Sequence, residues 1–347
     1  MTVGRDVLLN STLLLTLLVL TVWSLTIGPL PLSVADVMSA LFSTASSTSV
    51  DDLLSETDLQ TRYHIIVTEI RLPRALLAVL VGSSLGMSGA ALQGLLRNPL
   101  ADPGLLGVSA SASLGAVLCL YFGLSGLNLW LLPVSAMVFA AASTLLLALF
   151  ARRSSGNLVL ILAGIGLSSL TGALISLAIN LAPTPTDVQD IVLWLLGSIA
   201  DRSFDDILLC LPFVLAGLCI LMASGRGLNA LTLGDEEAAS LGVNLVRLRL
   251  MVIIGTALCV GASVAVAGAI GFIGLVVPHM LRKATHYHPA RLLIASALGG
   301  AVLLLAADIV LRLVSQDFEL MLGVVTSLIG APFFLLLIMR THTRGIR

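Results

Sequence analysis

Long apolar stretches dominate this sequence. About ten of them follow one another along the 347 residues, and most approach the roughly 20 residues that a helix needs to cross a bilayer. At about 22 residues for a tilted span, they would occupy about 220 residues. The connections are therefore too short for a folded soluble domain. Because the chain is 58% apolar and 11% charged, it also departs from the composition of soluble proteins. We predict an all-α, polytopic membrane protein with one transmembrane domain, residues 1–347.

Several classes of site are excluded or disfavoured by the residues present. A phosphate-binding P-loop needs the pattern G-x-x-x-x-G-K-[ST], and the only lysine, Lys283, follows Arg282. The sequence has no H-E-x-x-H pair, and we expect no catalytic residues. The four cysteines lack C-x-x-C spacing, and His286 and His288 suit a wet loop better than a metal site. A net charge of −1 gives no reason to expect nucleic acid.

We predict ten spans, which would place both termini on the same side of the membrane. The first lacks a small-x-small cleavage site, so we interpret it as a retained span and not as a signal peptide. The polar stretch at 28–62 is predicted to be an exposed external loop. The spans are expected near residues 8–27, 63–96, 105–123, 129–151, 158–181, 205–224, 250–267, 269–283, 291–313 and 321–339.

The basic residues predict the orientation. With cytoplasmic termini, 13 of the 18 basic residues lie inside, as expected from the retention of basic loops in the cytoplasm. The outside then keeps Arg62, Arg71, Arg74, Arg202 and Arg312.

Small residues recur every four positions along the second span, at Gly82, Gly86, Ala90 and Gly94. Such a ridge lets another helix approach closely. Packing within the chain is the simplest interpretation, but a subunit interface or the wall of a pathway would also use it.

The connection at 225–249 is the only predicted cytoplasmic loop long enough to build structure of its own. Asp235, Glu236 and Glu237 would lie in the first turn of a short helix, where carboxylates complement the helix dipole. Gly242 can end that helix. We expect this segment to dock a partner; the alternative is a solvated loop.

Four ordered blocks of sequence carry a family resemblance. RLPRALLAVLVGSSLGMSGAALQGLLRNPLADPGLLGVSASASLG at 71–115 resembles the signature of the FecCD/BtuC family, the permease subunits of type II ABC importers for iron complexes, haem and cobalamin. LGDEEAASLGVN at 233–244, GFIGLVVPHMLR at 271–282 and the blocks between 307 and 334 are similar to three further family segments. The resemblance covers nearly all of the chain after residue 60.

The resemblance implies a BtuC-like permease fold of ten transmembrane helices with cytoplasmic termini. It also implies a homodimer in the bacterial inner membrane, two cytoplasmic ATPase subunits and a periplasmic substrate-binding protein. ATP and Mg would bind to the ATPase, and this chain would bind no cofactor and no metal. On family frequency, an iron complex (haem or a ferric siderophore) is favoured over cobalamin.

The resemblance also assigns roles to individual residues. Arg71, Arg74 and Arg312 match arginines that meet carboxylates of the binding protein, although membrane-interface anchoring, or an ion pair of Arg312 with Asp308, would explain them too. The cytoplasmic gate would comprise Asn98, Pro99 and Leu100 with Ser155, Gly156 and Asn157, where the second group departs from the family's hydroxyl pattern. Coupling to the ATPase would use Leu233, Gly234, Asp235, Glu236, Glu237, Ala238, Ala239, Leu241 and Gly242.

Two other functional classes compete with this interpretation. An ion-coupled secondary transporter needs ionisable groups near the middle of the membrane, and Asp308 is the best candidate. Arg312, one turn away, would give it a structural partner instead. A membrane-embedded enzyme would need a nucleophile, base or ligand cluster, which the sequence lacks.

Overall fold

The computed structural model describes residues 2–42, 59–128, 130–153, 157–314 and 320–344, and this part of the chain contains helices and no strand. Its α-helices are α1 (Thr2–Thr26), α2 (Val34–Phe42), α3 (Leu59–Ile65), α4 (Leu72–Leu96), α5 (Val108–Tyr121), α6 (Leu131–Arg153), α7 (Asn157–Asn180), α8 (Pro185–Leu195), α9 (Phe204–Leu231), α10 (Asp235–Ser240), α11 (Leu245–Ala267), α12 (Ile273–Leu281), α13 (Pro289–Val314) and α14 (Leu322–Arg344). The prediction of an all-α protein is confirmed for these residues.

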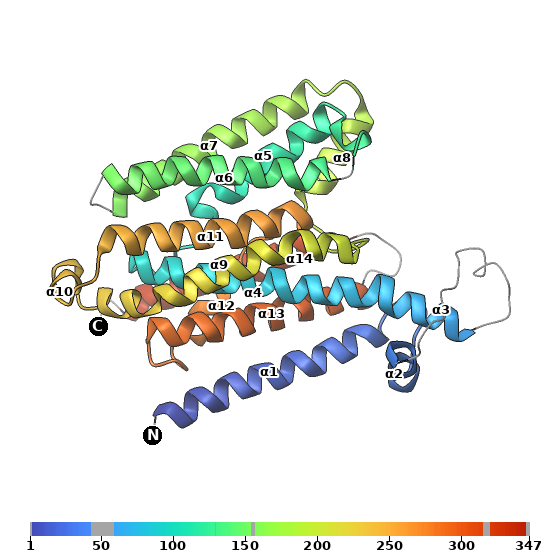
Figure 1. The fold of residues 1–347 in the computed structure, drawn as a ribbon, viewed down its shortest axis with the longest axis horizontal. Helices are drawn as coiled ribbons and strands as arrows, with labels where there is room; N and C mark the ends of the chain where they lie inside the picture. Colours follow the sequence, from blue (N-terminus) through green and yellow to red (C-terminus); the bar gives the residue numbers. More distant parts are fainter. Residues whose placement is uncertain (1, 43–58, 129, 154–156, 315–319, 345–347) are drawn as a thin grey trace.

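Helix α4 lies at the centre of the bundle and packs against α13, α11, α9 and α12 (Figure 1). In the same view α1 runs along one side, and α5 to α8 form a group on the other. The predicted ridge packs within the chain. A Cβ on Gly82 would lie 2.4 Å from the Gly300 carbonyl oxygen, and one on Gly86 would lie 2.0 Å from that of Ser296. Gly300 and Ser296 of α13 therefore lie so close to α4 that only glycine fits at positions 82 and 86.

Helix α4 continues an earlier helical segment, α3 followed by a π-helix at Ile66–Arg71. The Leu72 amide donates to the Val67 carbonyl, five residues back. Pro73 explains this widening, because it has no amide hydrogen and its ring would crowd the carbonyl four residues earlier. The predicted long second span is therefore confirmed as helical along its length, with an apolar helical stretch of 36 residues, Thr61–Leu96.

Seven helical stretches of the described chain are long and apolar enough to cross a membrane. They are Gly4–Thr26, Thr61–Leu96, Leu131–Arg152, Leu158–Asn180, Phe204–Leu231, Leu245–Ala267 and Pro289–Val314. Val108–Tyr121 and Leu322–Pro332 are shorter apolar helices. Both ends of the chain lie at the end of the bundle that carries α10 (Figure 1). At that end, Asp6 of α1 and Arg291 of α13 form an ion pair of 2.7 Å.

The predicted span at 269–283 is wrong as a single membrane-crossing helix. Gly268 and Phe272 both have positive φ, 68° and 67°, so the chain turns before α12 begins. Nine residues of α12 extend about 14 Å, less than half of a hydrocarbon core of about 30 Å. The turn is tolerated because it is packed inside the protein: the Ser198 amide donates to the Ala267 carbonyl at 2.8 Å.

The predicted external loop at 28–62 is also only partly correct. Its described residues include α2, which begins at a capping box in which Ser33 and Asp36 bind each other's amides. Val37 and Ala40 of α2 are buried. Residues 43–58 lie outside the described part of the chain.

The predicted cytoplasmic loop at 225–249 is shorter in the structure. Helix α9 continues to Leu231 and α11 begins at Leu245, so the connection is 232–244. Gly225 and Gly227 do not break α9, because their lack of a side chain lets Ala290 and Leu248 of the neighbouring helices pack closely. That packing outweighs the low helix propensity of glycine.

Candidate functional site

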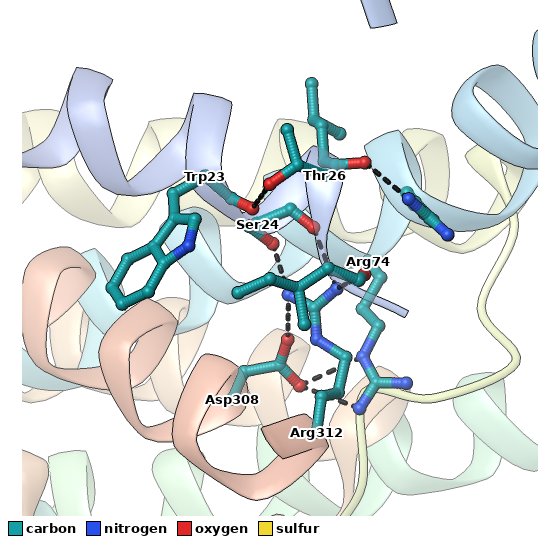
Figure 2. A network of polar contacts seen from close by, with 9 residues as sticks. Trp23, Ser24, Thr26, Arg74, Asp308 and Arg312 are labelled. Atoms are coloured by element: carbon teal, nitrogen blue, oxygen red, sulfur yellow. Dashed lines mark hydrogen bonds and ion pairs between the residues drawn. The ribbon is translucent and has the colours of Figure 1, made fainter. Parts of the chain in front are cut away.

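A buried carboxylate holds two of the three predicted docking arginines. Asp308 of α13 has no exposed surface, and its Oδ1 lies 2.8 Å from Nη2 of Arg74 on α4. Nε of Arg74 donates to the same oxygen at 2.9 Å. The other oxygen, Oδ2, lies 3.0 Å from Nη2 of Arg312, one helical turn along α13. Figure 2 shows the carboxylate between the two guanidinium groups.

Arg312 extends this network to α1. Its Nη1 donates to the carbonyl oxygens of Ser24 at 2.8 Å and Ile27 at 3.1 Å, and its Nη2 donates to the Ser24 hydroxyl (Figure 2). These carbonyls lie at the C-terminus of α1, where the helix dipole favours a cation. The network therefore joins α1, α4 and α13 at one point.

Arg71 takes a different position from the other two arginines. Its side chain is buried and donates to the carbonyl oxygens of Leu25, at 2.7 Å, and Leu30. The side chain therefore fixes the chain where it leaves α1. Of the three docking candidates, the side chain of Arg74 is 19% exposed and that of Arg312 is 10% exposed. Contact with a binding protein stays a prediction for all three.

A cavity of about 1040 Å³ opens beside this network, and we call it the outer cavity after the side on which these arginines are predicted to lie. Arg74 and Arg312 line it together with Arg202, Asp190 and Asp201. Trp194 and the beginnings of α14 and of the turn after α1 complete its wall. The sequence placed Arg202 outside the membrane but did not assign it, or the two aspartates, to a site. The polar segment around α8 was the sequence signal that could have pointed to these cavity residues.

The short helix predicted in the cytoplasmic connection is confirmed as α10, with Asp235, Glu236 and Glu237 in its first turn. Gly242 ends it in a left-handed conformation at φ 86°. The Gly242 amide donates to the Ala239 carbonyl and the Val243 amide to that of Ala238, the paired bonds of a Schellman motif.

The surface of α10 is unusual for a polar connection. Ala238 is buried against the bundle, whereas Leu233 and Leu241 are 63% and 66% exposed. Contact of these leucines with an ATPase subunit stays a prediction.

Asp235 also links α10 to two helices. Its Oδ1 lies 2.5 Å from Nη2 of Arg97, at the end of α4, and its Oδ2 lies 3.4 Å from Nη2 of Arg249 on α11.

The first predicted gate segment forms a tight turn directly after α4. Asn98 Oδ1 accepts from the Leu100 amide at 2.9 Å, and the Ala101 amide donates to the Asn98 carbonyl at 3.1 Å. Pro99 lies between them. Of the second predicted segment, Ser155 and Gly156 lie outside the described residues, and Asn157 is the first residue of α7. The gating role of both segments stays a prediction.

Within the described residues, no group of three or more His, Cys, Asp or Glu side chains could hold a metal ion. Of the cysteines, Cys119, Cys210 and Cys259 are buried and Cys219 is exposed.

Comparisons with known proteins agree with this geometry. The hemin transport system permease protein HmuU of Yersinia pestis is 40% identical over 332 residues, 94% of each chain. The vitamin B12 import system permease protein BtuC of Klebsiella pneumoniae subsp. pneumoniae is 39% identical over 287 residues, 83% of this chain and 86% of the relative. The uncharacterized ABC transporter permease protein YvrB of Bacillus subtilis (strain 168) is 44% identical over 288 residues, 82% of this chain and 81% of the relative.

A solved structure has the same fold. It is an inward-facing conformation of an ABC transporter assigned to the metal-chelate type, with a TM-score of 0.82 and 34% identity, covering 95% of this chain and 98% of that one. The model of the FecCD transport family matches residues 15–340. This multi-pass membrane chain is therefore a transport permease that belongs to the FecCD transport family.

Proposed function

We propose that this chain is the permease subunit of an ATP-driven importer, which moves an iron complex, haem or a ferric siderophore, across the bacterial inner membrane by alternating access. The observation that carries this proposal is the contrast between the two ends of the bundle, in a chain that the family model matches over residues 15–340. A large charged cavity lies at one end, and an acidic helix with exposed leucines lies at the other.

The partners follow from the two ends of the bundle. At the inner end, α10 meets a cytoplasmic ATPase subunit through Leu233, Leu241 and the acidic first turn. ATP and Mg bind to that separate chain. At the outer end, carboxylates of a periplasmic binding protein meet the partly exposed Arg74 and Arg312, since charge-assisted bonds between arginine and carboxylate give orientation as well as strength. Two copies of the permease and two ATPase subunits form the transporter.

The outer cavity offers guanidinium groups to an anionic iron complex. Arg74, Arg202 and Arg312 line it with two aspartates, and Arg74 and Arg312 keep part of their surface exposed beside Asp308. Haem and many ferric chelates carry carboxylates or a net negative charge, which arginines bind well. The hemin permease of Yersinia pestis also matches more of this chain, 94%, than the vitamin B12 permease of Klebsiella pneumoniae, 83%. Cobalamin is the alternative substrate.

Ion-coupled secondary transport is less well supported. Its best candidate residue, Asp308, is already held between Arg74 and Arg312. These two ion pairs give the buried carboxylate a structural role that joins α4 and α13.

The test is uptake into proteoliposomes that contain the permease, its ATPase and the binding protein. Haem, a ferric siderophore and cobalamin are offered separately, with ATP enclosed on the ATPase side. We expect ATP-dependent, vanadate-sensitive uptake of haem or the siderophore. A matched complex with an inactive ATPase is the control. Uptake that follows an imposed ion gradient without ATP would overturn the proposal, and transport of cobalamin alone would change the substrate.

A further inference from the structure

We propose that Asp235 is a positioning residue that connects α10 to the turn after α4, and that it carries movement of α10 to that turn by holding or releasing Arg97. The inference deepens the proposed function and rests on it, because it takes α10 to be the part that the ATPase moves.

One carboxylate serves two arginines from different helices. Asp235 Oδ1 contacts Arg97, and Asp235 Oδ2 contacts Arg249. The side chain of Arg97 is 45% exposed, whereas that of Arg249 is 7% exposed and lies within the bundle on α11. A buried arginine needs a nearby counter-charge, since its desolvation is otherwise uncompensated. Arg249 is therefore the fixed partner of Asp235, and Arg97 is the partner that can be released into water.

The backbone conformation of Arg97 sets the direction of the chain after α4. Arg97 adopts a left-handed conformation, φ 50° and ψ 32°, which a residue with a Cβ adopts at an energetic cost. The turn at 98–101 follows directly, and its two hydrogen bonds both end on Asn98. The ion pair with Asp235 holds Arg97 in this conformation. Its loss would favour an ordinary helical or extended backbone at Arg97 and would redirect the turn.

Helix α4 itself is held separately. Gln93, one helical turn before Arg97, accepts a hydrogen bond of 2.5 Å from Arg282, directly after α12. Its Nε2 lies 3.4 Å from the carbonyl oxygens of Gly274 and Leu275 on α12. The body of α4 therefore stays in place when the ion pair between Asp235 and Arg97 breaks. The change is confined to Arg97 and the residues after it.

The position of the turn can be measured on the purified permease without any partner. The amides of Leu100 and Ala101 both donate to Asn98, so their hydrogen exchange reports on the turn. We expect Arg97→Gln to raise exchange at these amides roughly two- to fivefold, the factor that corresponds to an exposed ion pair. Asp235→Asn also leaves the buried Arg249 without its counter-charge, so it should raise exchange at least as much. Asp235→Glu, which keeps the charge, should restore most of the protection.

A cysteine reporter gives an independent reading in case exchange is too fast to follow. Ala101 is fully buried, and Cys219 is the only exposed native cysteine among the described residues. In a Cys219→Ser background, Ala101→Cys should react slowly with a maleimide in the parent protein and faster after Asp235→Asn. Arg247→Gln, on an exposed arginine near Arg249, is the matched control and should leave both readings unchanged.

Coupling is then measured in the complete transporter as substrate molecules moved per ATP hydrolysed. We expect Asp235→Asn and Arg97→Gln to keep ATP hydrolysis while this ratio falls, and Asp235→Glu to recover it. Unchanged exchange and labelling would overturn the positioning role. Increased exchange with an unchanged ratio would overturn the coupling role. If the parent complex moves no substrate, the proposed function fails, and the exchange and labelling results still decide whether Asp235 positions the turn.

Discussion

Arg74 and Asp308 are separated by 234 positions in the sequence and form an ion pair of 2.8 Å. The pair joins the N-terminal end of the central helix α4 to the C-terminal half of α13. Arg312 contacts the second oxygen of the same carboxylate, so one buried charge orients two arginines at the wall of the outer cavity.

Asp308→Asn should destabilise the permease strongly. The change removes the counter-charge of two largely buried arginines, and loss of one partner from a buried ion pair typically costs about 3–5 kcal/mol. Thermal unfolding of the purified permease in detergent would measure it. Arg62→Gln, on an exposed arginine, is the control. An Asp308→Asn protein as stable as the parent would mean that water, and not Asp308, balances these arginines.

The contact between α4 and α13 should not tolerate a methyl group. In Gly86→Ala the new Cβ would lie 2.0 Å from the Ser296 carbonyl oxygen, so the two helices must separate. Overpacking of this kind costs about 1–3 kcal/mol or more. Gly172→Ala on α7 is the matched control, because a Cβ there meets nothing within 4 Å. Equal melting temperatures for the two variants would argue against close packing of α4 on α13.

The exposed leucines of α10 should matter for assembly with the ATPase. Leu241→Glu places a charge on a side chain that is 66% exposed in the permease alone, so the cost should fall on the partner interface. We expect less ATPase to copurify, with an unchanged melting temperature of the permease. Leu127→Glu, at an exposed leucine of the connection between α5 and α6, is the control. Full copurification with Leu241→Glu would remove α10 from the interface.

Docking of a binding protein should depend on Arg74 and on salt. Arg74→Gln leaves Asp308 paired with Arg312 and therefore preserves the fold better than a change to glutamate. Loss of a close charge pair at an interface costs about 2–5 kcal/mol when buried and less at a rim. Affinity should also fall with rising salt, since the screening length is about 10 Å at 0.1 M. If a folded Arg74→Gln protein docks as tightly as the parent, Arg74 serves Asp308 alone.

Helix α2 should loosen in acid. The hydroxyl and amide of Ser33 both donate to the Asp36 carboxylate, and these hydrogen bonds lower the pKa of Asp36. As pH falls from neutral, the unfolded segment takes up a proton before the folded one does, so the contribution to helix stability is lost between the ordinary and the lowered pKa.

Hydrogen exchange of α2 in the parent and in Asp36→Asn, compared at each pH, would measure this effect. The parent should be better protected near neutral pH, and the difference should vanish in acid. A difference that persists below the lowered pKa would show that the charge of Asp36 is not responsible.

Local patterns in the sequence determined several parts of this protein. The apolar stretches predicted most membrane helices, because burying the backbone in lipid requires each stretch to satisfy its own hydrogen bonds. The acidic turn at 235–237 and Gly242 predicted both ends of α10, because capping acts over a few residues. The capping box of Ser33 and Asp36 was equally visible and would have predicted α2.

Only the tertiary structure decided the rest. The turn before α12 depends on contacts with α8 and α14, so the apolar stretch at 269–283 alone did not predict it. Gly225 and Gly227 lie within α9 because neighbouring helices pack on them. Arg71, Arg74 and Arg312 look alike in sequence, yet Arg71 binds carbonyls at and just beyond the C-terminal end of α1, whereas the other two share Asp308. Long-range pairing of charges depends on which helix ends meet, and helix packing determines that.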